Sequence, residues 1–334
     1  MLSIFTWIEQ NLRPQYCSTE ELIYNDMESQ SGRSLPLVYQ PFVATRKGHW
    51  AALGGIYDYV HSTGTKGKSL LDFGPGDGWP SLVVAPHVKE VVGLDASSKR
   101  VEVCRKNAER LNITNAEFLS YTPGETLPFP DQSFDGVVAC SSVEQTPDPK
   151  ATLVELFRVL KPGGGLRLQY EGLARYRGGQ EQDLWTMGIN GENTKMILYN
   201  RDIKNEMALQ YALTLNISEA KVYEILSVDD QLAFSKVTVA LLEEIRPQIT
   251  RVQATKTVHP SCATWISWLR ELGFSRSLPT HNGRRVAASL FDQFTDANRP
   301  GDRQEIEDLI KIGANVAVSL ECPLDMDPNI TAIK

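Results

Sequence analysis

The chain has 334 residues, of which 42% are hydrophobic and 22% charged, and its formal net charge is −7. This length allows one large domain or two modest ones, and the acidic balance argues against a broad phosphate-binding surface and hence against a nucleic-acid partner. The five cysteines form no C-x-x-C pair, which is typical of reduced thiols. No basic segment precedes the apolar residues at the start, and no apolar run approaches the ~20 residues of a membrane helix. We therefore expect a cytoplasmic protein without a membrane partner.

A regular alternation of elements begins near residue 68. Short apolar runs bounded by turn residues predict strands at 68–73, 90–95, 116–121, 134–140 and 166–171. Apolar spacing and capping residues between these runs predict helices over 78–86, 98–111 and 148–160. Strands separated by helices of this length form a parallel, doubly wound α/β sheet.

The pattern changes after residue 171. Phe234, Val237, Leu241 and Ile245 form a stripe with helical spacing, and we expect 172–258 to be mostly helical. A helix capped by Ser261 and ended near residue 273 follows, then strand candidates at 275–280 and 285–292 and a helix at about 302–312. The predicted segments are an N-terminal helical cap segment (1–50), a doubly wound core (51–171), a helical insertion acting as a substrate cap or an oligomer interface (172–258), the completion of the core sheet (259–294), and a C-terminal helix and tail (295–334).

Three glycines, at 74, 76 and 78, follow the first strand directly in the stretch LLDFGPGDG. Glycine permits positive φ and lets a ligand approach the backbone, although a tight strand-to-helix turn without a ligand would use the same residues. Their spacing differs from the G-x-G-x-x-G of dinucleotide sites, and no phosphate-loop Lys-Ser/Thr follows. Asp95 ends the second strand, where it can accept hydrogen bonds from two ribose hydroxyls or cap the next helix.

Four blocks resemble the class I S-adenosylmethionine-dependent methyltransferases, specifically the small-molecule branch that includes enzymes of ubiquinone and menaquinone biosynthesis. The blocks are LLDFGPGDG, VVGLDAS, LPFPDQSFDGVVACSSVEQTPDP and LFRVLKPGGGLRL, and 261–293 resembles the final helix and two strands of that family. The resemblance implies a Rossmann-like, doubly wound seven-stranded sheet whose last strand is antiparallel. It also implies S-adenosyl-L-methionine as cofactor and a small, partly apolar methyl acceptor.

The resemblance further implies a cofactor site in the core. Its residues would be Asp72, Gly74, Gly76, Gly78, Asp95, Ala96, Gly124, Glu125, Cys140 and Ser141. In that site Asp72 would orient the methionine ammonium, Asp95 would bind the ribose, and Ala96 would lie beside the adenine. Gly124 and Glu125 would offer backbone N–H groups to the adenine edge. The backbone of Cys140 and Ser141 would pass close to the methyl-bearing region.

The chain departs from the family pattern at two positions. Pro123 stands where relatives often have an acid that binds the adenine amine, and Gln145 stands where relatives often have a histidine near the transferred methyl. A glutamine side chain cannot accept a proton at neutral pH, so the base comes from elsewhere or the nucleophile needs none. Glu144 and Glu171 follow the fourth and fifth strands, where ligands bind, and are the catalytic candidates, although each is also typical of a solvated or capping acid.

Other side chains carry weaker signals. The histidines have no ligand spacing, so we expect no metal, and His259 and His281 reach a substrate only if they are not ordinary core or surface residues. Some aromatic residues can line an acceptor cavity or simply fill the core: Tyr39, Phe42, Trp50, Tyr170, Tyr176, Trp185 and Tyr199.

Three functions compete on this sequence. The first is methyl transfer from S-adenosylmethionine to a small molecule. The second is a non-catalytic, methyltransferase-like binding module, which the glutamine at 145 favours. The third is a nicotinamide-dependent oxidoreductase, which the glycine spacing disfavours. A homodimer formed through 172–258 is compatible with each of them.

Overall fold

The computed structural model of the chain describes residues 3–27, 35–175, 178–226, 234–326 and 328–334. Contacts divide the chain into two compact units, each formed by several segments. We call them the small unit (Met1–Glu28, Gln145–Pro147, Glu171–Pro260) and the large unit (Ser29–Glu144, Asp148–Tyr170, Ser261–Lys334). The segments predicted from the sequence do not follow this division, because 3–27 groups with the small unit and 35–50 with the large one.

The large unit is built on a seven-stranded sheet with the order β11-β12-β6-β5-β2-β3-β4. The strands are β2 (Ser69–Phe73), β3 (Glu90–Asp95), β4 (Ala116–Ser120), β5 (Phe134–Cys140), β6 (Leu160–Gln169), β11 (Arg276–Thr280) and β12 (Asn329–Ile333). The first five run parallel, whereas β12 is antiparallel to both of its neighbours. The predicted doubly wound α/β sheet with an antiparallel last strand is therefore confirmed.

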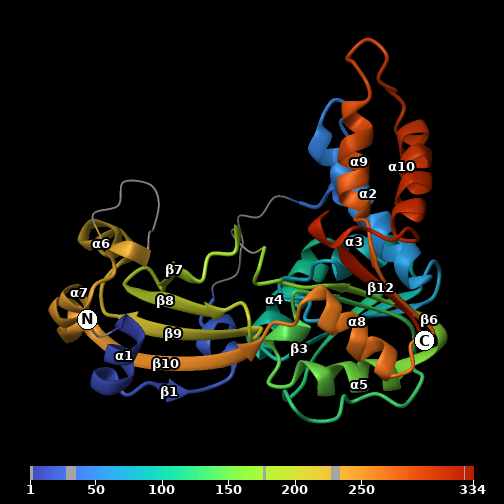
Figure 1. The fold of residues 1–334 in the computed structure, drawn as a ribbon. Coiled ribbons are helices and arrows are strands. Elements are labelled where there is room, and N and C mark those ends of the chain that lie inside the picture. Colours follow the sequence, from blue (N-terminus) through green and yellow to red (C-terminus); the bar gives the residue numbers. More distant parts are fainter. Residues whose placement is uncertain (1–2, 28–34, 176–177, 227–233, 327) are drawn as a thin grey trace. The chain divides into compact units, whose positions relative to one another are not determined.

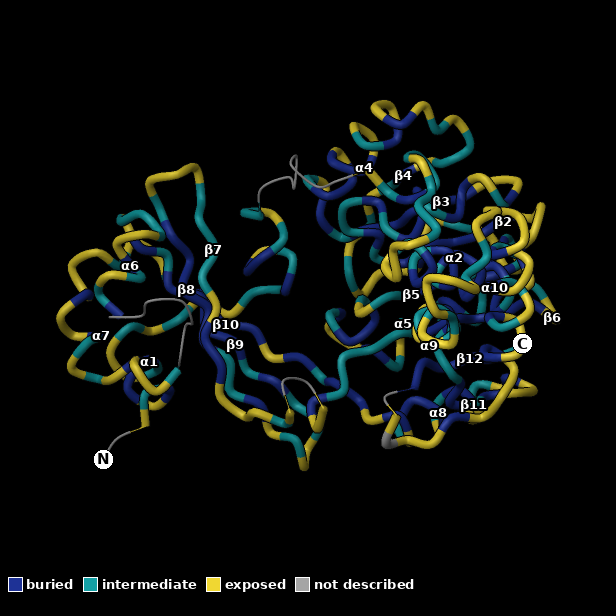
Figure 2. Tube along the Cα trace, turned by 90° about the horizontal axis from the view of Figure 1, so that it is seen from above, coloured by how far each residue is buried: buried dark blue, intermediate teal, exposed yellow. Residues whose placement is uncertain are grey.

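Helices cover both faces of this sheet because its central strands are apolar on both sides (Figure 1). Every residue of β2 is buried, and the central strands lie in the interior of the unit in Figure 2. Helices α5 (Pro149–Val159) and α8 (Cys262–Glu271) pack on the face that carries Leu71, and α2, α3 and α4 lie on the face that carries Leu70. The bounds of the latter helices are Lys47–Thr63, Ser81–Val84 and Ser98–Arg110.

Two helices form a further layer on α2, namely α9 (Gly283–Asp292) and α10 (Arg303–Ala317). The prediction of a strand at 285–292 is wrong. Asn282 caps α9 by accepting from the backbone N–H of Arg284 at 2.9 Å, and the buried Ala287 and the partly buried Leu290 and Phe291 keep a helical spacing against α2. The seventh strand is β12 instead, so 259–294 supplies only β11 to the sheet and the predicted tail supplies the rest.

Strand β6 also begins earlier than predicted. It runs from Leu160 and includes the KPGGG stretch (161–165), which precedes the strand predicted at 166–171. Gly165 pairs with Gly136 of β5, and a Cβ on Gly165 would lie 2.5 Å from the carbonyl oxygen of Ser62 in α2. Glycine therefore serves here to let a helix approach the sheet closely.

The small unit is a sheet with the order β1-β10-β9-β8-β7 and short helices on one face. Its elements are α1 (Ile4–Leu12), β1 (Gln15–Tyr16), β7 (Gln182–Ile189), β8 (Asn193–Asp202), β9 (Met207–Leu215), α6 (Glu219–Ile225), α7 (Val239–Ile245) and β10 (Ile249–Val258). The prediction of a mostly helical insertion at 172–258 is wrong, because the four antiparallel strands β7 to β10 form its main structure and its helices α6 and α7 have only seven residues each.

The physical reason for this error lies in the side-chain alternation of the segment. Met196 and Leu198 of β8 and Leu213 of β9 point to the same apolar cluster, whereas the residues between them point away, which is the period of a strand. The helical stripe that suggested the prediction is real but short, since it covers only a 3-10 turn at Phe234–Lys236 and α7.

In the described part of the chain, no helix is long and apolar enough to cross a membrane.

Candidate active site

The candidate site lies in the large unit where β2 ends. Strand β2 has β3 on one side and β5 on the other, so the order of the strands reverses there. In open α/β sheets, ligands bind at the carboxyl ends of the strands at such a switch point. The residues Gly74–Gly78, which we call the glycine loop, leave β2 at this end and lead to α3.

The glycine loop has a backbone that side chains would disturb. Gly74, Gly76 and Gly78 have φ values of 75°, 56° and 101°, a region that disfavours residues with a Cβ. A Cβ on Gly74 would lie 2.3 Å from the Cβ of Ser142, which follows β5. A Cβ on Gly76 would instead meet no atom within 4 Å. The middle of the loop thus faces open space that a ligand can occupy.

Asp72, the last but one residue of β2, is fully buried beside this loop. One carboxylate oxygen, Oδ2, accepts hydrogen bonds from the backbone N–H and the hydroxyl of Ser81, at 2.9 and 2.5 Å. The other oxygen, Oδ1, is buried and has no hydrogen-bond partner among the described residues. Burial raises the pKa of Asp72 to about 7, against the effect of the Ser81 hydrogen bonds. A buried acceptor without a donor suits a ligand that brings a positively charged donor.

Asp95 lies at the end of β3 and holds the middle of the loop. Its Oδ2 accepts from the N–H of Gly76 at 3.1 Å, and its Oδ1 accepts from the N–H of Ser97 at 2.9 Å. The N-cap of α4 is Ser97, whose hydroxyl accepts from the N–H of Arg100. The alternative in which Asp95 itself caps the helix is therefore wrong, and its carboxylate stands at the loop.

The other predicted cofactor residues surround this pair. Ala96 follows β3 and is partly exposed, whereas Gly124 and Glu125 lie exposed in the turn after β4. Gly124 has a φ of 88° with open space at its Cβ position, as Gly76 has. The N–H of Glu125 donates to the carbonyl of Thr122 at 3.1 Å, so it is already engaged within the turn.

The end of β5 borders the loop on its other side. Ser141 has a φ of 52°, unusual for a residue with a side chain, and its N–H donates to the carbonyl of Gln169 at 2.9 Å. The thiol of Cys140 lies 3.8 Å from the hydroxyl of Tyr59, and burial raises its pKa, so it stays neutral. Residues with an unusual backbone conformation, as Ser141 has, cluster at functional sites.

The two candidate bases fall in different units. Glu144 is fully buried in a 3-10 turn (Val143–Gln145) after β5, in the large unit. Glu171 belongs to the small unit, where burial raises the pKa of its carboxyl and the nearby Arg201 partly offsets that effect. The catalytic role of each stays a prediction.

The weaker candidates are mostly structural. His259 is buried, and burial lowers its pKa to about 4, so it is a neutral ring held by the Thr257 hydroxyl at 3.0 Å.

Most of the aromatic candidates are core residues. The indole of the fully buried Trp50 donates to the carbonyl of Ala44. Tyr39, Phe42 and Tyr170 also pack against core clusters, while Trp185 and Tyr199 pair with each other in the small unit. Tyr176 lies outside the described residues.

Several residues at the site were not predicted. Ser81 holds the carboxylate of Asp72 through its backbone N–H and its hydroxyl. Ser142 holds the end of β2, because its hydroxyl donates to the Phe73 carbonyl at 2.6 Å. Arg100, Cys104 and Asn107 of α4 contact the glycine loop. Their spacing of four and three residues marks one helix face, which is a signal that the sequence does contain.

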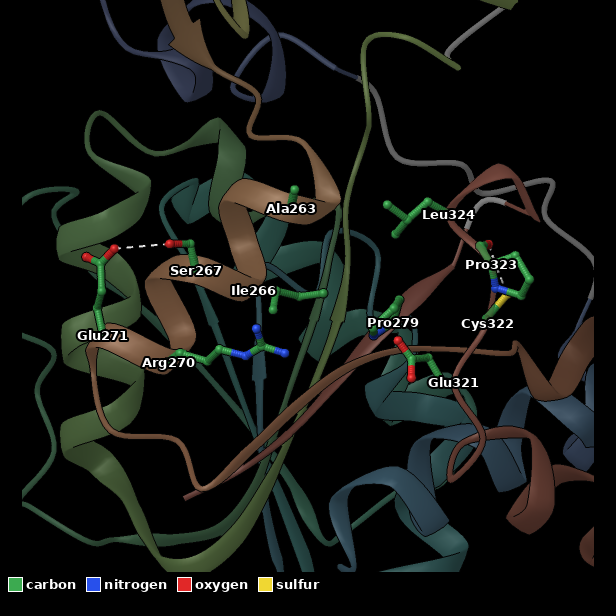
Figure 3. A pocket seen from close by; sticks show the side chains of 10 residues that line it. All are labelled: Ala263, Ile266, Ser267, Arg270, Glu271, Pro279, Glu321, Cys322, Pro323 and Leu324. Carbon is green, nitrogen blue, oxygen red and sulfur yellow. Dashed lines mark hydrogen bonds between the residues drawn. The ribbon is translucent and has the colours of Figure 1, made fainter.

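A pocket of about 720 Å³ lies elsewhere in the large unit, between α8 and the segment 321–324. Figure 3 shows Arg270 and Glu321 extending toward it from opposite walls, with Ile266 and Pro279 nearby. It contains none of the predicted cofactor residues.

Among the residues that the structure describes, no group of His, Cys, Asp and Glu side chains has the geometry of a metal site.

Comparison with known proteins identifies the core. Residues 71–168 match the family described as Methyltransferase domain. The uncharacterized methyltransferase YcgJ of Bacillus subtilis is 37% identical over 95 residues, which are 28% of this chain and 37% of that protein. The 27-O-demethylrifamycin SV methyltransferase of Amycolatopsis mediterranei is 36% identical over 103 residues, 30% of this chain and 38% of that protein. A demethylmenaquinone methyltransferase of Listeria monocytogenes is 36% identical over 104 residues, 30% of this chain and 44% of that protein.

The three sequence matches cover similar parts of the proteins. They fall on about a third of the chain and span less than half of each relative's own length. Among solved structures, the CcbJ methyltransferase from Streptomyces caelestis aligns with a TM-score of 0.49 at 12% identity, over 94% of this chain and 97% of that one. The family match confirms the resemblance that the sequence blocks suggested.

Proposed function

We propose that this chain, whose residues 71–168 match the methyltransferase domain family, is a class I S-adenosylmethionine-dependent methyltransferase that transfers a methyl group to a small and partly apolar acceptor. The observation that carries the proposal is the pair of buried carboxylates, Asp72 and Asp95, on either side of a glycine loop that leaves open space at Gly76. When bound, S-adenosylmethionine supplies a methyl group already activated on a sulfonium. The protein therefore has mainly to hold, orient and desolvate the reactants.

The residues of the site fit such a cofactor. Asp72 is suited to accept from the methionine ammonium through Oδ1, the buried oxygen without a donor. Asp95 is suited to accept from ribose hydroxyls while it fixes Gly76. Ala96 and Gly124 would border the adenine.

The end of β5 would complete the site near the reacting centre. The positive φ of Ser141 turns the backbone there, and the neutral thiol of Cys140 would make it a packing residue and not a nucleophile. We assign both residues to the wall beside the sulfonium end of the cofactor.

Two glutamates are candidates for the base that removes a proton from the acceptor. Glu144 stands closest to the site in sequence and follows β5, so it is our first candidate for a general base. Glu171 is the second, because burial holds its pKa above that of an ordinary glutamate and so closer to neutral pH. An acceptor that is already ionised would need neither residue.

The names of two relatives support the proposed class of acceptor. Their names specify 27-O-demethylrifamycin SV and demethylmenaquinone as substrates, and both are small molecules with apolar parts. The net charge of −7 also disfavours a nucleic-acid acceptor. We therefore propose an acceptor of this small, partly apolar kind.

Calorimetry tests the proposal. We expect S-adenosylhomocysteine to bind and NADH not to bind in matched titrations, and tight binding of NADH alone would refute a methyltransferase. A labelled methyl donor with a panel of oxygen, nitrogen, sulfur and carbon nucleophiles then tests turnover. Binding without transfer to any acceptor class would favour the non-catalytic alternative.

A further inference from the structure

One face of helix α4 is directed at the glycine loop. The guanidinium of Arg100 donates to the carboxylate of Asp77 at 2.6 Å, and the amide of Asn107 donates to the backbone carbonyl of Asp77 at 2.9 Å. Between them, the thiol of Cys104 lies 3.1 Å from the carbonyl oxygen of Gly76. The spacing of four and three residues places all three side chains on the same side of the helix.

The central contact of this face is a buried ion pair. The side chain of Arg100 is 2% exposed and that of Asp77 is 10% exposed. Taking two charges out of water is costly, and replacing such a pair with apolar residues is often neutral or stabilising. A buried ion pair is therefore weak evidence for stability alone, and its position on a ligand-binding loop indicates a different role.

The loop itself needs external support. Gly74, Gly76 and Gly78 all have positive φ, and glycine loses more conformational freedom on ordering than any other residue. Gly76 is fixed at its N–H by Asp95 and at its carbonyl by Cys104. Asp77 is fixed at both its backbone carbonyl and its side chain by α4. Residues outside the loop thus hold its backbone in place without a ligand.

We propose that Arg100 and Asn107 are positioning residues, which hold the glycine loop in the conformation that binds the cofactor. Neither needs to touch the cofactor, because both act through Asp77. Holding the loop in advance removes an ordering cost that binding would otherwise bear. This inference rests on the proposed function, since it assigns these residues to the same cofactor site.

Two conservative variants test the inference without removing the buried charge. Arg100→Lys keeps the positive charge but loses the planar fork of the guanidinium. Asn107→Ala, at a partly exposed position, removes the amide that donates to the Asp77 carbonyl, together with a long, exposed contact to Arg110 at 3.4 Å. We expect the Kd for S-adenosylhomocysteine to rise about fivefold in each, because one hydrogen bond is worth about 1 kcal/mol. Lys106→Ala is the matched control, since Lys106 lies on the outer face of α4 and pairs with Glu102, and its Kd should stay within about twofold of the wild type.

Two further measurements separate positioning from a general loss of stability. At saturating S-adenosylmethionine, kcat should stay within about twofold of the wild type while KM for the cofactor rises with Kd. Amide exchange in the unliganded variants should accelerate in residues 74–80 and stay unchanged in the rest of the large unit.

The outcomes distinguish this inference from the proposed function. If the wild type binds S-adenosylhomocysteine and both variants bind it equally well, the positioning role is refuted and the proposed function stands. Faster exchange throughout the large unit with an unchanged Kd would also refute the positioning role. If the wild type itself does not bind S-adenosylhomocysteine, the proposed function fails, and the inference fails with it.

Discussion

Cofactor binding should depend on pH through Asp72. Burial raises the pKa of this carboxyl to about 7, so in the unliganded protein the acid form persists up to neutral pH. An ammonium group is attracted only to the ionised carboxylate. Affinity for S-adenosylhomocysteine should therefore be lost as the pH falls through 7, and it should level off above about pH 8.

The size of this effect follows from the ionised fraction. With a pKa of about 7, roughly one tenth of Asp72 is ionised at pH 6 and roughly nine tenths at pH 8. The Kd should consequently rise about ninefold from pH 8 to pH 6, which is about 1.3 kcal/mol. Cys104, which adjoins the loop, does not contribute over this range because burial raises its pKa.

Isothermal titration at pH 6, 7 and 8 measures this change. Repeating the pH 6 titration in buffers of different ionisation enthalpy should show a proton released on binding, because the bound ammonium lowers the pKa of the carboxyl. Asp72→Asn should bind more weakly at pH 8 and show no such pH dependence. A flat profile in the wild type, or an unchanged slope in Asp72→Asn, would refute the assigned contact.

Further substitutions test other parts of the site and the fold. Asp95→Ala should weaken S-adenosylhomocysteine binding by about 1.5–3 kcal/mol in the same titration, since hydrogen bonds to a charged acceptor are lost, and an unchanged Kd would mean that the ribose is held elsewhere. Gly76→Ala should raise that Kd more than about tenfold, because it strains the loop and fills the open space. Gly64→Ala, with a similar φ of 64° and open space at the end of α2, should only lower stability. Asp58→Ala should destabilise the protein by about 3–5 kcal/mol in denaturant unfolding, because it leaves the buried Arg167 without its carboxylate partner, and a smaller loss would show that water or another group compensates that charge.

The core could be predicted from the sequence because its signals are local. Each strand from β2 to β5 is a short apolar run with clear turns beside it, and Ser97 and Asp148 cap the helices α4 and α5 through their side chains. The glycines and Asp95 could be singled out as candidates, because their spacing reflects backbone geometry that only a few residue types permit, and their role in a cofactor site stays a prediction. The family match over 71–168 agrees with this part.

The remaining features depend on tertiary contacts that the sequence pattern does not reveal. Whether an apolar run such as 285–292 becomes a helix or a strand depended here on Asn282 and on packing against α2. The buried state of Asp72 and its partner Ser81 could not be read from the motif, because hydrogen bonds across a turn leave no periodic signal. The acceptor and the location of the protein in the cell stay predictions.

The position of β12 has a consequence for the order in which the chain folds. This strand pairs with β6 across residues 170–328, a span that includes most of the small unit. Strands β7 to β10 of that unit pair with their successive neighbours along the chain, so their contacts are much more local. Local pairings form faster than distant ones, and a segment that has already folded shortens the loop that remains to be closed. We therefore expect the antiparallel sheet of the small unit to form early, and the central sheet of the large unit to be completed last, when β12 enters between β6 and β11.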